Sequence, residues 1–157
     1  MTLLEAPILQ GKALDVSLQG KVDDLQKAIS RLKLLRAHDA LVLLKNSISI
    51  PKLLYRLRTS NCYNHLHLLK FDAVLKTGLS SIFNVDFDET QWTQATIPVS
   101  DGGLGIRSAN MLATSAFLAS AASTYSLQQS ILQSSHNPVI YQVQVSVEAT
   151  LEIAFVR

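Results

Sequence analysis

The sequence has little of several residue types that usually define a protein class. Cys62 is the single cysteine among 157 residues, which excludes an internal disulfide framework and a cysteine-based zinc site. One cysteine is typical of a reducing intracellular compartment, although it does not distinguish nucleus from cytoplasm. Only 17% of the residues are charged and 48% are apolar, which argues against disorder across the chain. We therefore expect one folded domain.

Long hydrophobic runs are also missing. The first eight residues include Glu5 and Pro7, so they do not resemble the apolar core of a secretory signal. The most apolar stretch, residues 111–122, is interrupted by Thr114 and two serines, and it is shorter than the roughly 18 residues that a membrane helix needs. These absences predict a soluble protein with no membrane partner.

Aromatic residues are scarce, at 6%, and leucine dominates the apolar set, which favours helices. Val22, Leu25, Ile29 and Leu32 recur at steps of three and four, which predicts an amphipathic helix from about Ser17, after a connector over residues 10–15. The other predicted helices cover about residues 40–46, 50–58, 65–83, 88–95 and 108–126, and a polar stretch over 128–135 follows the last one.

We predict a mainly α fold, a helical bundle of about five to six helices over residues 14–135. Residues 1–13 are expected to form a short extended lead-in, with an edge strand as one form of it. In residues 136–157 every odd position from Val139 to Phe155 is apolar, a period of two that predicts a β-strand tail. No other segment offers a clear strand to pair with it, so self-association through this tail is one expectation.

The strongest functional candidate is a set of basic residues in the first half of the chain. Residues 1–76 contain twelve basic and six acidic residues, whereas residues 77–157 contain two basic and six acidic ones. This asymmetry indicates that the first half faces an anion, and a solvated basic face is the alternative. The predicted backbone contacts in this half are Lys45, Lys52, Arg56 and Arg58, with Tyr55 and Tyr63 for stacking and Lys27, Arg31, Lys33 and Arg36 behind them. Arg107, at the start of the last predicted helix in the second half, is a further candidate for contact with a phosphate.

Other reactive residues favour structural interpretations. Asp23 and Asp24 are adjacent on a predicted helix and diverge by about 100°, so we interpret them as first-turn acids paired with Lys27 rather than as metal ligands. The four histidines show no ligand spacing, and we expect solvated or capping roles for them. Cys62 lacks an evident histidine and aspartate partner set. We expect no metal, no cofactor and no catalytic residue.

The segment from Trp92 to Ala109 has three glycines and is too particular for a generic loop. Gly102, Gly103 and Gly105 suggest a dinucleotide-binding loop, but Ser108 stands where its third glycine or alanine is needed, and no buried strand precedes it. We therefore predict a structural corner in which Trp92 anchors a short helix, Pro98 stiffens the link and the glycines turn the chain into the last helix.

Six segments in order resemble the region downstream of the catalytic palm in non-LTR (LINE-like) reverse transcriptases. They are LLEAPI (residues 3–8), HDALVLLK (38–45), IPKLLYRLRT (50–59), FDAVL (71–75), WTQATIPVSDGGLGIRSA (92–109) and FLAS (117–120), and the resemblance covers about residues 2–125. Glu5 departs from the family, which commonly has a glycine there. The aromatic-X-Asp-Asp motif of the palm does not occur in the sequence.

The resemblance implies the thumb or connection region of a reverse transcriptase, which cradles the template–primer duplex in the intact family. RNA-directed DNA synthesis would belong to the palm, so we expect a non-catalytic fragment with weak, salt-dependent contact to an RNA–DNA duplex or other nucleic acid. A helical protein-interaction module, or a relic reading frame without a selected role, is the alternative.

Overall fold

The computed structural model describes residues 2–3, 6–7 and 11–132, and this part of the chain is mainly helical, as predicted. Two short strands precede the α-helices. A π-helical segment joins α2 to α3, and a 3-10 segment lies between α5 and α6. In chain order the elements are β1 (Thr2–Leu3), β2 (Ala6–Pro7), α1 (Lys12–Leu32), α2 (Ala37–Leu43), η1 (π, Leu44–Ile48), α3 (Ile50–Thr59), α4 (Leu66–Phe83), α5 (Glu89–Thr96), η2 (3-10, Val99–Asp101) and α6 (Ala109–Leu132).

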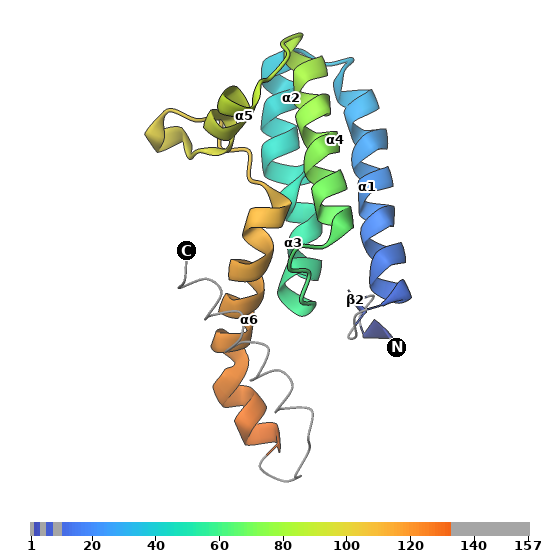
Figure 1. The fold of residues 1–157 in the computed structure, drawn as a ribbon, viewed down its shortest axis with the longest axis vertical. Coiled ribbons are helices and arrows are strands. Elements are labelled where there is room, and N and C mark those ends of the chain that lie inside the picture. Colours follow the sequence, from blue (N-terminus) through green and yellow to red (C-terminus); the bar gives the residue numbers. More distant parts are fainter. Residues whose placement is uncertain (1, 4–5, 8–10, 133–157) are drawn as a thin grey trace.

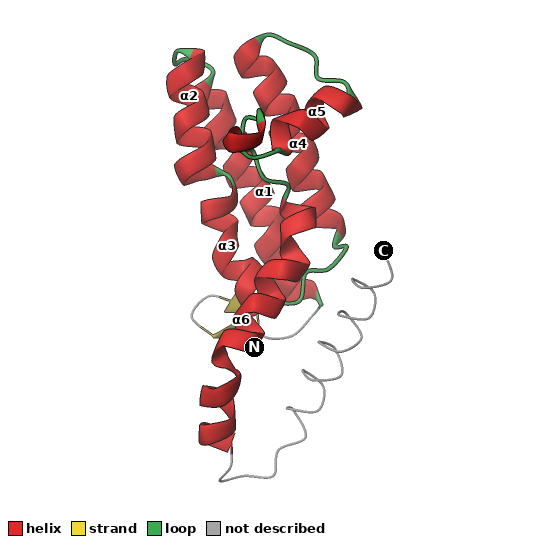
Figure 2. Cartoon of the chain, turned by 90° about the vertical axis from the view of Figure 1, so that its left-hand side faces the viewer, coloured by secondary structure: helices red, strands yellow, loops and turns green. Residues whose placement is uncertain are grey.

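The helices run up and down beside one another (Figure 1). The chain ascends in α1, descends through α2, η1 and α3, ascends in α4 and descends again in α6. α1 packs on α4, α3 packs on α6, and α5 and η2 protrude to one side where the chain enters α6. The second half of α6 extends beyond the bundle, as the perpendicular view also shows (Figure 2).

α1 begins earlier than the sequence predicted. Leu14 and Leu18 are buried and continue the stripe of Val22 at steps of four, so burying them extends the helix back to Lys12. The predicted connector over residues 10–15 is therefore wrong from Lys12 onward, as is the boundary of the helical region at residue 14. Asp23 and Asp24 consequently lie in the middle of α1 and not in its first turn.

The N-terminal lead-in contains a minimal antiparallel hairpin. Thr2 pairs with Pro7 and Leu3 pairs with Ala6, so each strand is only two residues long. β2 contacts α1 and α3 at the lower end of the bundle. The extended character predicted for this segment is confirmed for these four residues.

The middle helices follow the predicted boundaries closely. Ile50 and Pro51 open α3 as expected, and Leu53 and Leu57 face the core. The second helix starts at Ala37, three residues before its predicted start, and a π-helical turn joins it to α3. The hydrophobic core consists mostly of leucine, isoleucine and alanine from α1, α3, α4 and the start of α6, with single residues from α2, η1, α5 and two loops.

The residues just before α5 and α4 cap these two helices with their side chains. Asp88 accepts a hydrogen bond from the N–H of Gln91 at 2.7 Å, and the Gln91 side chain accepts one from the N–H of Asp88, which forms a capping box at α5. His65 precedes α4, and its Nδ1 accepts a hydrogen bond from the N–H of His67. The capping role predicted for the histidines is confirmed for His65.

α6 continues to Leu132, so the predicted end of this helix at about residue 126 is wrong. Residues 128–132 of the predicted polar stretch are helical. Polar side chains support the helix there, because Gln128 donates to the Thr124 hydroxyl and Gln129 to the Tyr125 hydroxyl, each one turn away. The predicted β-strand tail, residues 136–157, lies outside the described residues. No helix in the described part of the chain is long and apolar enough to cross a membrane.

Candidate nucleic-acid interface

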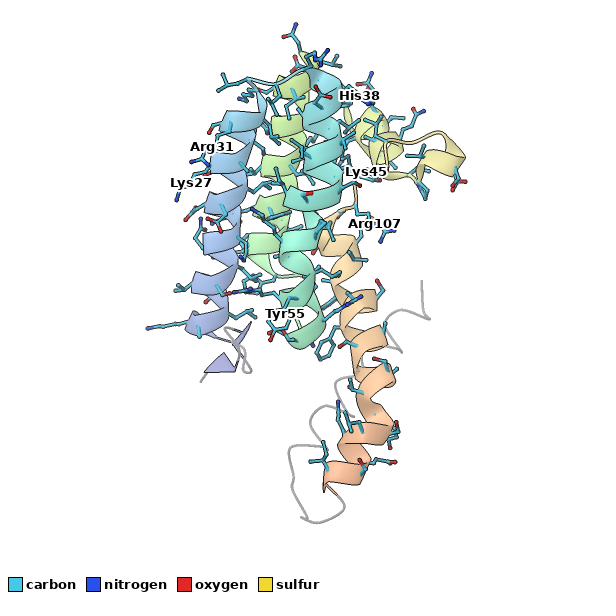
Figure 3. The ribbon with its side chains drawn as sticks, turned by 180° about the vertical axis from the view of Figure 1, so that it is seen from behind. Lys27, Arg31, His38, Lys45, Tyr55 and Arg107 are labelled. Atoms are coloured by element: carbon cyan, nitrogen blue, oxygen red, sulfur yellow. The ribbon has the colours of Figure 1, made fainter. Side chains whose placement is uncertain are left out.

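The basic residues do not form one continuous patch. Lys27 and Arg31 point outward from α1 on one edge of the bundle, whereas Lys45 and Arg107 lie on the opposite edge (Figure 3). Arg36 is exposed and pairs with Asp39 at 3.3 Å. Two of the residues predicted to stand behind the α3 set, Lys27 and Arg31, thus lie on the edge of the bundle opposite to Lys45 and Arg107.

α3 carries a row of exposed residues on one flank. Lys52, Tyr55 and Arg58 follow one another at steps of three, which places them next to each other on the helix surface, and all three are exposed. At 1.5 Å per residue, Lys52 and Arg58 are roughly 9 Å apart along the axis. Tyr55 comes between them along the helix, and its exposed ring can stack on a base or sugar. We refer to Lys52, Tyr55 and Arg58 as the α3 row.

Arg56 has a structural role that the sequence did not reveal. Its side chain is partly buried, and its Nε donates a hydrogen bond to the Ser17 hydroxyl of α1 at 3.2 Å. Its guanidinium also lies 6.0 Å from the centroid of the Tyr55 ring. Arg56 therefore helps to join α1 to α3, and replacing it would alter the bundle as well as the charge.

The sequence on either side of the α3 row contains no acidic residue that could neutralise the charges of Lys52 and Arg58. No acidic residue occurs between Asp39 and Asp72, while five basic residues do. No ion pair within the described part of the chain involves Lys45, Lys52, Arg58 or Arg107. This stretch consists of the end of α2, η1, α3 and the first turn and a half of α4.

Tyr63 is exposed on the loop that follows α3, where its N–H donates to the Asn61 side chain at 3.2 Å. It lies beyond the end of the helix and does not share the α3 row. A shallow groove of about 400 Å³ runs between α1 and α4. Its lining includes Lys33 but none of the five residues predicted to contact a phosphate.

The end of the Lys45 side chain lies against Gly105, in the segment that leads into α6. Lys45 lies in η1 and is partly buried, and a Cβ placed on Gly105 would stand 2.6 Å from its Nζ and 3.0 Å from its Cε. Gly105 also has a φ of +70°, so two independent constraints favour glycine there. Arg107, two residues further on, is exposed.

The structure explains the glycines of the Trp92–Ala109 segment as a corner. Gly102 ends η2 with a φ of +85°, and Gly103 packs against the backbone carbonyl oxygens of Ile97 and Gln94. Pro98 precedes η2. The corner is closed by hydrogen bonds from the N–H of Gly105 to Ile97 and from the N–H of Ile106 to Ala95.

Trp92 is half-buried and packs against the core, and Ile106 is fully buried. The bulky residues on either side of the turn therefore pack the corner against the bundle. No strand precedes the glycines within the described corner, which differs from a dinucleotide-binding loop.

Asp72 is the residue that sequence reasoning missed. From α4 its carboxylate accepts hydrogen bonds from the Ser108 hydroxyl at 2.6 Å and from the N–H groups of Ala109 at 2.7 Å and Asn110 at 3.1 Å. Burial raises the pKa of Asp72, and these hydrogen bonds offset part of that effect. The sequence signal for this role was an acidic residue inside an otherwise basic stretch. Its hydrogen-bond partners could not be identified from the sequence, because they lie more than thirty-five residues away along the chain.

Asp72 occupies the N-terminus of α6, where the unpaired N–H groups of a helix otherwise attract a phosphate. A phosphate near Arg107 therefore has to be held by side chains and not by the start of this helix.

Several of the other acids, and His65, are engaged in structural contacts. His65 Nε2 lies 3.0 Å from the Asp15 carboxylate, which links α4 to α1. Asp24 lies 3.9 Å from Lys21, and Asp23 accepts a hydrogen bond from the Gln19 side chain, so the predicted pairing with Lys27 is replaced by partners one turn earlier. Among the described residues no group of three His, Cys, Asp or Glu side chains is placed to hold a metal ion.

Cys62 is almost fully buried, and burial raises the pKa of its thiol to about 11. The thiolate is the reactive form, so we expect alkylation by iodoacetamide at pH 8 to be at least about tenfold slower in the folded protein than in urea. The rate should increase as the pH is raised toward 11. Equal rates in the two states would show that Cys62 is accessible.

Comparison of the chain with protein-family models, with curated proteins and with solved structures gave no match.

Proposed function

We propose that this chain is a helical domain that binds a nucleic-acid backbone through the α3 row and that carries no catalytic site of its own. Such a role agrees with the resemblance to the thumb and connection region of LINE-like reverse transcriptases. The proposed ligand is an RNA–DNA duplex or another nucleic acid, which the domain binds without changing it chemically.

The observation that carries this proposal is the exposed row on α3, which lies in a stretch of sequence without acidic residues between Asp39 and Asp72. Lys52 and Arg58 are exposed cations with no ion pair among the described residues, and Tyr55 lies between them. Cations of this kind bind phosphates by releasing condensed counterions, so the affinity falls as salt rises. An aromatic ring between two cations adds stacking that tolerates any base.

Replacing Lys52 and Arg58 together by glutamine should weaken binding to an RNA–DNA duplex. We expect the slope of log K against log salt to become shallower by about two, because two phosphate contacts are lost. Fluorescence anisotropy with a labelled duplex at several salt concentrations measures both quantities. Arg56 is left intact, because it joins α3 to α1.

Lys27→Gln with Arg31→Gln is the matched control for this experiment. It removes the same charge from α1, where both side chains point outward from one edge of the bundle and are exposed (Figure 3). The control should leave the slope nearly unchanged. Equal losses in the two double variants would show undirected attraction to net charge and would contradict the proposed site.

A second candidate function, a protein-interaction module, is favoured by α6. This helix contains no charged residue, and its second half extends beyond the bundle (Figure 2). Tyr125, Leu127 and Ile131 are exposed on that part. Association of the protein that is insensitive to salt and survives the Lys52→Gln/Arg58→Gln change would favour this function over nucleic-acid binding.

A further inference from the structure

We propose that Lys45 and Arg107 form a second phosphate-binding site, where η1 meets the segment that enters α6. The ligand is a phosphate group, either in a nucleic-acid strand held by the α3 row or as a free anion. The first of these sources rests on the proposed function, and the second does not.

The geometry of Lys45 is the first observation behind this site. The lysine stem lies over the α-carbon of Gly105, which has no side chain to displace it, and Val99 flanks the same glycine. A long side chain that is partly buried in this way loses less freedom on binding than a fully exposed lysine. Partial burial therefore restricts the positions that the ammonium takes before the ligand arrives.

The second observation is the unpaired charge of both cations. Gly105, over which the end of Lys45 lies, is two residues from Arg107, and Figure 3 shows Lys45 and Arg107 on the same edge of the bundle. Neither cation takes part in an ion pair among the described residues. Two like charges repel each other, and a phosphate placed between them relieves that repulsion.

The third observation concerns what the site excludes. The N–H groups at the start of α6 already donate to Asp72, so they do not compete for the phosphate or contribute to its binding. The site therefore depends on the two side chains, and removing either charge should abolish it. Lys45 also lies in a π-helical segment, a geometry that is frequent at functional sites.

Charge removal provides the first test, with the full chain and a labelled RNA–DNA duplex. We expect Lys45→Met and Arg107→Gln each to lower the affinity roughly three- to tenfold at moderate salt and to reduce the salt slope by about one. Lys27→Met removes the same charge from the far edge of the bundle and should change the affinity less than about twofold.

A pair of glycine substitutions tests the site without changing any charge. Gly105→Ala introduces a Cβ that displaces the Lys45 ammonium, whereas Gly102→Ala introduces one with nothing within 4 Å. Both glycines have positive φ, so both variants carry comparable backbone strain. We expect Gly105→Ala to weaken duplex binding as Lys45→Met does, and Gly102→Ala to retain the wild-type affinity.

Titration with inorganic phosphate distinguishes the two sources of the ligand. Amide NMR shifts at Gly105 and Arg107 that depend on phosphate and disappear in Lys45→Met would establish the site even if the duplex does not bind, in which case the proposed function alone fails. Selective losses with the duplex alone would identify a strand phosphate. The site is overturned if Lys45→Met behaves like Lys27→Met with both probes.

Discussion

Replacing Asp72 by alanine is expected to lower the free energy of unfolding by about 2 kcal/mol. The change removes the acceptor of three hydrogen bonds that tie the start of α6 to α4. It leaves the N–H groups of Ala109 and Asn110 without this partner at a largely buried helix end. Urea unfolding followed by circular dichroism measures the loss.

Asp72→Asn is the matched variant, because an amide oxygen still accepts a hydrogen bond from the start of α6. We expect it to retain at least about half of the stability that alanine loses, since asparagine is a good N-cap. Equal stabilities of the wild type and the alanine variant would show that the carboxylate does not hold α6 in place.

The difference in stability between the wild type and Asp72→Asn should depend on pH, because the pKa of Asp72 is raised. A carboxyl whose folded pKa lies above its ordinary value of 3.8 binds its proton more tightly in the folded state. The wild type should therefore gain stability relative to Asp72→Asn as the pH falls through the raised pKa toward 3.8, and lose that gain as the pH rises again. A relative loss on acidification would contradict the direction of the shift.

Gly103→Ala should be the most damaging single-methyl change in the corner, lowering the free energy of unfolding by roughly 3 kcal/mol. Its Cβ would overlap the carbonyl oxygen of Ile97 and stand 2.6 Å from that of Gln94. Both are backbone atoms, so the turn has to open and the hydrogen bonds that Ile97 and Ala95 accept are strained. Thermal unfolding monitored by circular dichroism and by Trp92 fluorescence reports the change.

Gly102→Ala separates crowding from backbone strain in that experiment. A Cβ on Gly102 meets no atom within 4 Å, and only its φ of +85° opposes alanine. We expect a cost of about 1 kcal/mol for this variant. Should the two variants lose the same stability, the close approach of Gly103 to the Ile97 carbonyl would not be the cause.

The helices were largely predictable because their signals are local. The stripe of Val22, Leu25, Ile29 and Leu32, the Ile50-Pro51 start and the Asp88 cap all depend on residues within one or two turns of each other. The errors lie at helix ends. There the packing of Leu14 extends α1, and side-chain hydrogen bonds along an exposed surface extend α6 past its predicted end.

The candidate site was only partly predictable from residue types. Lys52, Arg58 and Tyr55 share a flank of α3 because of helical spacing, which the sequence contains. The partial burial of Arg56 against Ser17, and the position of Lys27 and Arg31 on the edge opposite to Lys45 and Arg107, follow from how the helices pack. Local spacing carries no information about this.

The sequence by itself determined the mainly helical fold, most helix starts, the turn at the glycines and the positive balance of the first half. Only the tertiary structure decided that Asp72 caps α6, that Lys45 lies over Gly105 and that the basic residues divide between two edges. The physical reason is distance along the chain: periodicity and capping act over a few residues, whereas these contacts join residues that are 36 to 60 positions apart.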